Sequence, residues 1–197
     1  MNHFLKKGII IVLVAVFTAV TVGFSFFQPF KPDAVREAIP AGTSFIFKAN
    51  NLDELLQSPV CGQLDNALGA GNSLKDLLAS NDWKNLAAAS EIAVADIPFR
   101  NAGEQKTWAT VSWIGWRSPW LRWKFEQARD KNLKLLGKHA VWPVWQYSSP
   151  DLARGMSLTF SLTDNLFIAC LSENPSDILL LLDTYDQRSP AAHHNEG

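Results

Sequence analysis

Tryptophan and cationic side chains are the residues of this chain whose types and spacing most suggest chemistry. Eight tryptophans occur in 197 residues, and five of them lie in the segment 108–123. Arginine and lysine alternate with the rings in RSPWLRWK, residues 117–124. Indole rings beside cationic side chains are typical of binding interfaces. The candidate binding surface consists of Trp108, Trp116, Arg117, Trp120, Arg122, Trp123 and Lys124.

Three interpretations of this cluster stay open. In the first, the indoles fill the core, and each needs a partner for its N–H group. In the second, exposed rings and local positive charge engage an envelope polymer or a partner protein. In the third, the segment rests on the outer leaflet of a membrane, where Trp and Arg are favoured. On the strand expected over 107–116, Trp113 belongs to the core face, while Trp108 and Trp116 share the half-polar and more exposed face.

Catalytic chemistry has little support. His139 is the one histidine of the expected folded domain, because His3 precedes it and His193 and His194 follow it. The chain has no G-x-S-x-G segment, so we interpret His139 as structural. We therefore predict no catalytic residue, and an enzyme is the less favoured class.

Cofactor and metal sites are not predicted either. Cys61 and Cys170 are the two cysteines, and they are isolated from His139 rather than clustered as zinc ligands are. Whether the two cysteines form a disulfide stays open at this level. Gly69 and Gly71 lack the Lys-Ser/Thr ending of a phosphate-binding loop and are interpreted as a helix end.

Charge is unevenly distributed along the chain, although the formal net charge is −1. Residues 51–104 contain eight acidic and three basic residues, whereas residues 117–138 contain seven basic and two acidic ones. The basic segment suits an acidic partner or anionic head groups, although opposite patches are also common within one fold. Nucleic acid is not expected as a partner.

An apolar run of 20 residues lies at 8–27, directly after Lys6 and Lys7. Such a run is long enough to cross a bilayer as a helix. Its bulky end does not suit cleavage as a signal peptide, and it lacks the polar stripe of a core helix. We therefore predict a transmembrane anchor with the lipid bilayer as its partner. The flanking lysines predict a single-pass inner-membrane protein with a cytoplasmic N-terminus and residues from about 31 onward outside the cytoplasm.

The remaining residues have the composition of one globular domain, with 19% charged and 47% hydrophobic residues in the whole chain. Alternating apolar residues predict strands, and helical spacing with caps predicts helices between them. The expected strands are 43–49, 91–98, 107–116, 133–136, 139–147, 156–162 and 166–171. The expected helices are 34–38, 52–57, pieces within 60–90, 118–131 and 176–185.

These elements predict an α+β fold: one N-terminal transmembrane helix, then a mostly antiparallel sheet with helices packed on one side. Within the sheet, we expect a hairpin that turns at Gly137 and Lys138, and Pro143 favours an edge position or a bulge for the strand 139–147. The expected organisation is a cytoplasmic N-terminus at 1–7, an anchor at 8–27, a stalk at 28–38, an exported domain at 39–186 and a disordered tail at 187–197.

Two stretches resemble a group of uncharacterised bacterial membrane-anchored envelope proteins. They are IPAGTSFIFKANNLDELLQSP, residues 39–59, and SLTFSLTDNLFIACLSENPSDILLLLD, residues 157–183. The resemblance implies one N-terminal anchor and an exported α+β domain, and the group has no assigned catalytic residues. Its members are usually longer, often with a second related half, so the chain is expected to be a minimal member or a truncated copy.

The sequence therefore predicts a membrane-anchored extracytoplasmic domain that acts as a non-enzymatic binding or assembly module of the cell envelope. The alternative is an envelope hydrolase, which would need a serine and an aspartate within hydrogen-bond reach of His139. A truncated half of a longer two-repeat envelope protein is the remaining alternative.

Overall fold

The structure is a computed structural model and describes residues 12–19, 23, 31, 33–68, 91–97, 107–128, 131–148, 152, 155–189 and 191. The chain divides into two compact units, Met1–Phe30 and Lys31–Gly197. The helical pieces predicted within 60–90 are described only as far as Leu68, and the loop predicted at 100–106 lies outside the described residues.

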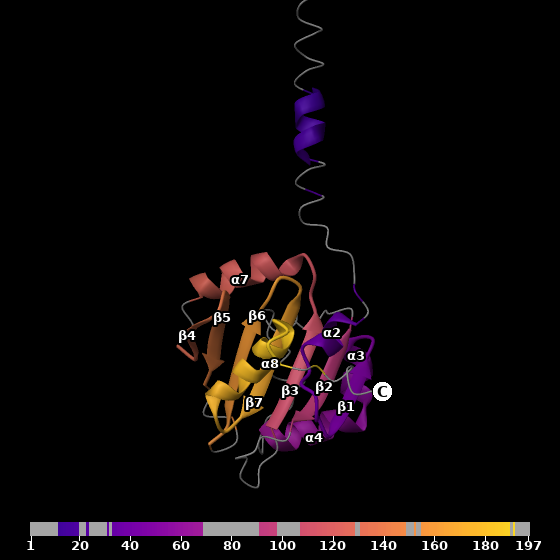
Figure 1. Ribbon diagram of the computed structural model, residues 1–197, viewed down its shortest axis with the longest axis vertical. Coiled ribbons are helices and arrows are strands. Elements are labelled where there is room, and N and C mark those ends of the chain that lie inside the picture. The colour runs from indigo at the N-terminus through magenta and orange to yellow at the C-terminus, as the bar shows by residue number, and fades with distance from the viewer. Residues whose placement is uncertain are drawn as a thin grey trace, which may run out of the picture. The chain divides into compact units, whose positions relative to one another are not determined.

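Seven strands of the second unit form one antiparallel sheet in the order β1-β2-β3-β7-β6-β5-β4 (Figure 1). The strands are β1 Phe45–Ala49, β2 Ile92–Ile97, β3 Thr107–Trp113, β4 Leu133–His139, β5 Trp142–Tyr147, β6 Ser157–Leu162 and β7 Leu166–Ser172. Strands adjacent in sequence pair in two series, β1 to β3 and β4 to β7, and the pairing of β3 with β7 joins them. The centre of the sheet is therefore a contact between residues far apart in the chain.

Helices cover both faces of this sheet. They are α2 Ala34–Glu37, α3 Leu52–Gln57, α4 Pro59–Leu68, α7 Arg117–Gln127 and α8 Ile178–Tyr185, with a short 3-10 helix at Pro175–Asp177 before α8. Residues of α2 and α8 share a core with Val111 and Ile168, and Figure 1 looks onto this face. Residues of α3 and α4 share a second core with Val94, and α7 shares a third with Phe160.

The predicted fold class is wrong in two respects. Helices do not lie on one side of the sheet, because every residue of β7 is buried and both of its faces carry apolar side chains. Ile168 points into the core with α8, whereas its neighbour Ala169 lies in the core with α7. Side chains of successive strand residues point to opposite faces, so both faces of β7 need a cover.

The second correction concerns the transmembrane helix predicted over residues 8–27. Within that range, helical backbone is described at residues 12–19 and at residue 23. A helix that crosses a bilayer core of about 30 Å needs roughly 20 residues. In the part of the chain that the structure describes, no helix has the length and apolar character needed to cross a membrane. The inner-membrane location derived from that helix stays a prediction.

The hairpin of β4 and β5 turns later than predicted. The turn is formed by Ala140 and Val141 rather than by Gly137 and Lys138. Ala140 takes the left-handed conformation, with a φ of 53°. The glycine instead serves a bulge, because the register of β4 against β5 shifts between Leu135 and Gly137.

Pro143 does not put its strand at the edge of the sheet. β5 lies between β4 and β6, and β4 is the outer strand. Pairing of β5 with β6 begins only at Val144, which is opposite Ser161. The proline therefore lies beyond that ladder, and its carbonyl accepts a hydrogen bond of 2.8 Å from the Ser161 hydroxyl. A strand can contain proline where no ladder hydrogen bond is required of its nitrogen.

Candidate functional site

Helix α7 carries most of the predicted binding residues, and its inner side is fixed to the sheet. Leu121 is 1% exposed and lies in the core with Phe160. The buried Ser118 hydroxyl donates to the carbonyl of Thr163 in the turn between β6 and β7. The helix begins at Arg117 with Trp116 as its N-cap, so the Ser118 hydroxyl serves the attachment to the sheet rather than the helix end. These contacts hold α7 rigidly at the end of the β6–β7 hairpin.

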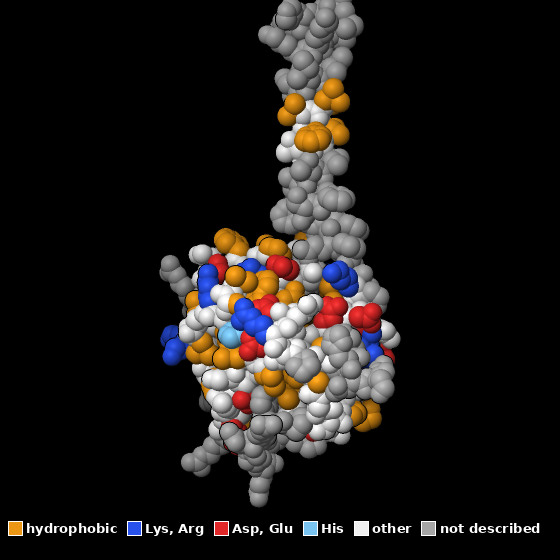
Figure 2. Space-filling view, in the orientation of Figure 1, with side chains coloured by type: hydrophobic (Ala, Val, Ile, Leu, Met, Phe, Trp, Pro, Cys, Tyr) orange, Lys and Arg blue, Asp and Glu red, His pale blue; other side chains and the backbone are white. Residues whose placement is uncertain are grey.

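The outer side of α7, together with its N-cap residue Trp116, presents three tryptophans. Trp116, Trp120 and Trp123 are 62%, 49% and 60% exposed. Their spacings of four and three residues place the rings on one face of the helix. Figure 2 shows hydrophobic side chains gathered along the margin of the molecule where α7 lies. We call these three residues the α7 tryptophan stripe.

Two of the predicted cationic residues have different surroundings. The Lys124 amino nitrogen lies 5.4 Å from the centre of the Trp120 ring, so its charge is held beside the stripe. Arg122 turns inward instead: its Nη2 donates to the Leu162 carbonyl over 3.0 Å, and its guanidinium carbon lies 5.4 Å from the Trp142 ring. Arg122 therefore belongs to the attachment of α7 to the sheet.

Arg117 is half-buried at the first turn of α7. It precedes Trp120 by three residues and lies seven residues before Lys124. Residues at these spacings share one side of a helix. Arg117 and Lys124 thus flank the tryptophan stripe along the same edge of α7.

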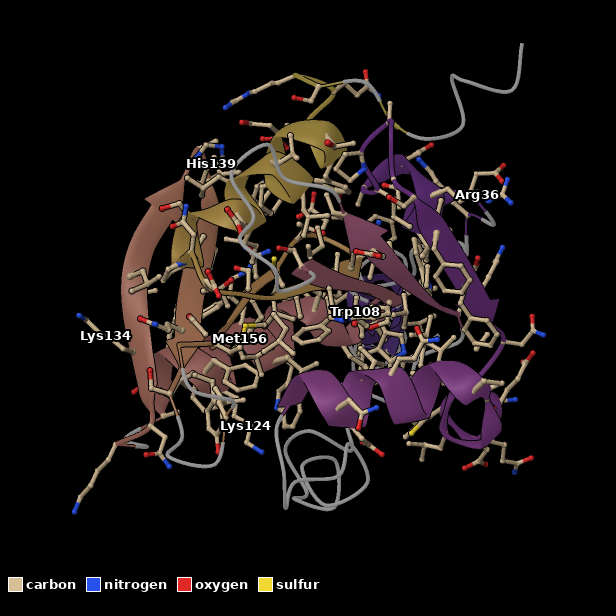
Figure 3. The ribbon with its side chains drawn as sticks, turned by 90° about the horizontal axis from the view of Figure 1, so that it is seen from below. Arg36, Trp108, Lys124, Lys134, His139 and Met156 are labelled. Carbon is tan, nitrogen blue, oxygen red and sulfur yellow. The ribbon has the colours of Figure 1, made fainter. Side chains whose placement is uncertain are left out.

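Trp108 does not belong to this surface. It is 4% exposed and shares a core with Leu55 and Leu64, because α3 and α4 cover the strand face that the sequence predicts to be exposed. Figure 3 shows Trp108 in the interior of the molecule. Trp113, which is predicted to be core, is buried on the opposite face of the sheet.

The tryptophan cluster is thus divided between the core and the surface. Among the described tryptophans, the core interpretation holds for Trp108, Trp113, Trp142 and Trp145. The three tryptophans of the α7 stripe are exposed, so only a surface role applies to them. Strand periodicity alone could not make this division, because it does not report whether a helix covers a given face.

His139 lies within hydrogen-bond distance of an aspartate of α8. Its Nε2 lies 2.7 Å from Asp183 Oδ1, which ties β4 to α8. Asp183 also lies 3.6 Å from Arg188 Nη1. In the described part of the chain, the hydroxyls of Ser118, Ser161 and Ser172 all donate to backbone carbonyls, and no serine is bonded to His139. The aspartate required for a hydrolase is present, but none of the described serines lies beside the histidine as a nucleophile.

Both cysteines remain thiols. Cys170 lies in the core with α8, whereas Cys61 belongs to α4 on the opposite face of the sheet, so the sheet separates them. Burial raises the pKa of Cys170 to about 12. A thiol that stays protonated is a poor nucleophile and metal ligand. Over the described ranges, no three His, Cys, Asp or Glu side chains are grouped closely enough to hold a metal ion.

Comparison with known proteins found no matching family model, curated protein or solved structure. The resemblance of residues 39–59 and 157–183 to bacterial envelope proteins therefore stays a prediction.

Proposed function

We propose that the second unit is a non-enzymatic binding module that recognises an acidic partner protein through the α7 tryptophan stripe. The observation that carries the proposal is the exposure of three indole rings on one face of a helix whose other side is firmly packed. Burial of apolar surface stabilises by roughly 25 cal/mol per Å². Indole rings that are about half exposed therefore leave a large apolar area whose burial by a partner would stabilise the complex.

The spacing of the rings favours a protein as the ligand. Anchors at positions i, i+4 and i+7 are characteristic of a helix that inserts into a groove of another protein. Tryptophan and arginine are also the residues most enriched among those that dominate protein interfaces. Trp116, Trp120 and Trp123 have this spacing, and Arg117 lies beside them.

The charge of the surroundings favours an acidic partner. Arg117 and Lys124 lie on the same edge of α7 as the rings, and residues 117–124 contain no acidic residue. Lys124 is held against the Trp120 ring, so the partner would meet charge and aromatic surface together. Electrostatic complementarity of this kind raises the association rate and orients the partner.

The alternative of an envelope hydrolase would need a serine beside His139, and the described residues show none there. His139 contacts Asp183, whereas the hydroxyls of Ser118 and Ser161 donate to backbone carbonyls. The sequence predicts a location in the cell envelope. The interaction proposed for α7 does not depend on that location.

The test replaces Trp120 and Trp123 together by alanine in the full chain, with a photo-crosslinking amino acid at Gln127, the last residue of α7. We expect the parent chain to form a crosslink in cells to a protein whose contact site, located by mass spectrometry, is acidic. The double variant should lose this crosslink by about tenfold or more, because two buried rings contribute several kcal/mol. Phe45→Ala is the matched control, since Phe45 is an exposed aromatic residue (42%) on β1 at the other end of the sheet.

Three results would overturn the proposal. One is that the double variant retains the crosslink. Another is that it is destabilised by more than about 2 kcal/mol in urea unfolding, since exposed residues usually change stability by about 0.5 kcal/mol or less. The third is tight binding of the parent chain to phosphatidylglycerol vesicles that the double variant loses, which would assign the stripe to a membrane surface.

A further inference from the structure

Strand β4 is the last strand of the sheet, and in the described part of the chain its outer edge is open. It pairs with β5 on one side, and the described residues place no strand on its other side. The five residues from Lys134 to Lys138 are all exposed. An edge strand presents a row of backbone N–H and C=O groups that an extended segment can pair with.

The edge also carries apolar side chains. Leu135 is 51% exposed and Leu136 is 42% exposed. Large exposed apolar side chains on a sheet edge indicate either a contact site or a risk of aggregation. Other features of the strand decide between these.

A pocket lies beside this edge. It has a volume of ≈ 180 Å³ and opens between the end of α7 and the strands β4 and β5. That volume is large enough for one aliphatic side chain. Its lining consists of Phe125, Glu126, Ala128, Leu133, Leu135 and Trp145. Leu133 and Leu135 therefore connect the pocket directly to the open edge.

Two lysines select the charge of a pairing segment. Lys134 is opposite Gln146 and Lys138 is opposite Pro143. The bulge between Leu135 and Gly137 puts the two lysines on opposite faces of the sheet. Figure 3 shows Lys134 extending outward from the edge of the sheet. A pairing segment therefore meets positive charge on both faces.

The same lysines disfavour a second copy of this chain. An antiparallel pair of β4 strands centred on Leu136 would place Lys134 opposite Lys138 of the second copy. Like charges directly opposite one another are destabilising in a sheet. An acidic segment, in contrast, gains charge complementarity from both lysines.

We propose that β4 takes up an extended acidic peptide segment of a partner protein as an additional strand of the sheet. Its acidic residues lie against Lys134 and Lys138, and an apolar residue between them enters the pocket beside Leu135. Lys134 and Lys138 are four residues apart in β4, but the bulge makes them span only three residues of a paired strand. The two acids are therefore three residues apart in the segment. This site is separate from the α7 tryptophan stripe.

The probe is a fluorescein-labelled peptide, Thr-Glu-Thr-Val-Glu-Val-Thr, whose binding to the full chain is measured by fluorescence anisotropy. We expect saturable binding that weakens as salt rises. A peptide with lysine in place of both glutamates should not bind. A third peptide, N-methylated at alternate residues, retains charge and side chains but cannot complete the backbone ladder, so it should not bind either.

Charge reversal identifies the site on the protein. The variant K134E/K138E should bind the peptide about tenfold or more weakly, because two ion pairs become repulsive. Lys131→Glu is the matched control, since Lys131 is an exposed lysine of the same segment that lies outside β4. The variant with alanine at positions 120 and 123 should retain peptide binding, so failure of one proposal is distinguishable from failure of the other.

Four results would overturn the inference. Two concern the peptides: the N-methylated peptide binds as tightly as the parent peptide, or the acidic peptide does not bind at all. The other two concern the protein: Lys131→Glu weakens peptide binding as much as K134E/K138E does, or the parent chain sediments as a dimer that K134E/K138E abolishes. The last result would assign the edge to a second copy.

Discussion

Cys170 is a described residue whose ionisation is strongly shifted, with a clear cause. It is 0% exposed in the core between the sheet and α8. Burial disfavours the charged thiolate and raises the pKa of Cys170 from 9.0 to about 12. The Cys170 thiol is therefore protonated at neutral pH. Its ionisation affects the free energy of unfolding only at high pH.

The stability of the unit should fall in alkali because of this residue. Between pH 9 and about pH 12 the unfolded chain releases the Cys170 proton while the folded chain keeps it. The contribution is fully present below pH 9 and is lost as pH rises through the folded pKa, by up to about 1.4 kcal/mol per pH unit. Urea unfolding of the parent chain and of Cys170→Ala from pH 8 to pH 11 measures the difference.

The variant controls for the other groups that titrate in this range. Burial also raises the pKa of Tyr185, and this residue is present in both proteins. We therefore expect both curves to decline and the parent curve to decline more steeply. Parallel curves would show that Cys170 is not the source.

At the scale of the elements, the β4–β5 hairpin shows how a local signal can be correct in kind and misplaced in position. Gly137 predicts a break in the strand, and a break is present there as a bulge. The reversal itself occurs at Ala140, whose left-handed φ of 53° is unfavourable for a residue with a Cβ atom. Pairing of β4 with β5 over their whole length outweighs this local cost.

Replacement of Ala140 by glycine should therefore stabilise the unit. Glycine adopts a positive φ without steric conflict, although it adds entropy to the unfolded chain. The net gain expected is about 0.5 kcal/mol in the free energy of unfolding. Thermal or urea unfolding measures it, and Val141→Ala, at the neighbouring exposed position, is the control. A loss of stability in Ala140→Gly would show that the turn carries no strain.

At the scale of the whole molecule, the two strand series of the sheet depend on one another. They meet where β3 pairs with β7, and Thr110 opposite Ala169 lies in the middle of this contact. The cores on the two faces share these strands. Loss of the joint would expose both faces at once, so the second unit should unfold in a single step.

Ile168→Ala tests this cooperativity. Ile168 is 0% exposed in the centre of β7, and its truncation should lower the free energy of unfolding by about 2–5 kcal/mol. Far-UV circular dichroism and tryptophan fluorescence should give the same, lowered transition midpoint. Trp108 and Trp113 report on opposite faces of the sheet, so separate transitions would contradict the prediction.

Patterns local in the chain determined much of this protein from its sequence alone. The strands 107–116 and 166–171 were predictable because their alternation and flanking turns act over a few residues, and β3 and β7 lie there. The helix at 52–57 was predictable from its cap, and the Asn51 side chain accepts from the Glu54 N–H over 2.8 Å. The α7 tryptophans were also identified as candidates from residue type and spacing.

Only the tertiary structure decided which of these candidates form a surface. Trp108 and Trp120 are the same residue type in neighbouring elements, but Trp108 lies under α3 and α4, whereas nothing in the described part of the chain covers Trp120 to that extent. The same holds for the open edge at β4 and for helices on both faces of the sheet. Exposure depends on which distant segments pack against a residue, and those contacts leave no periodic signal in the local sequence.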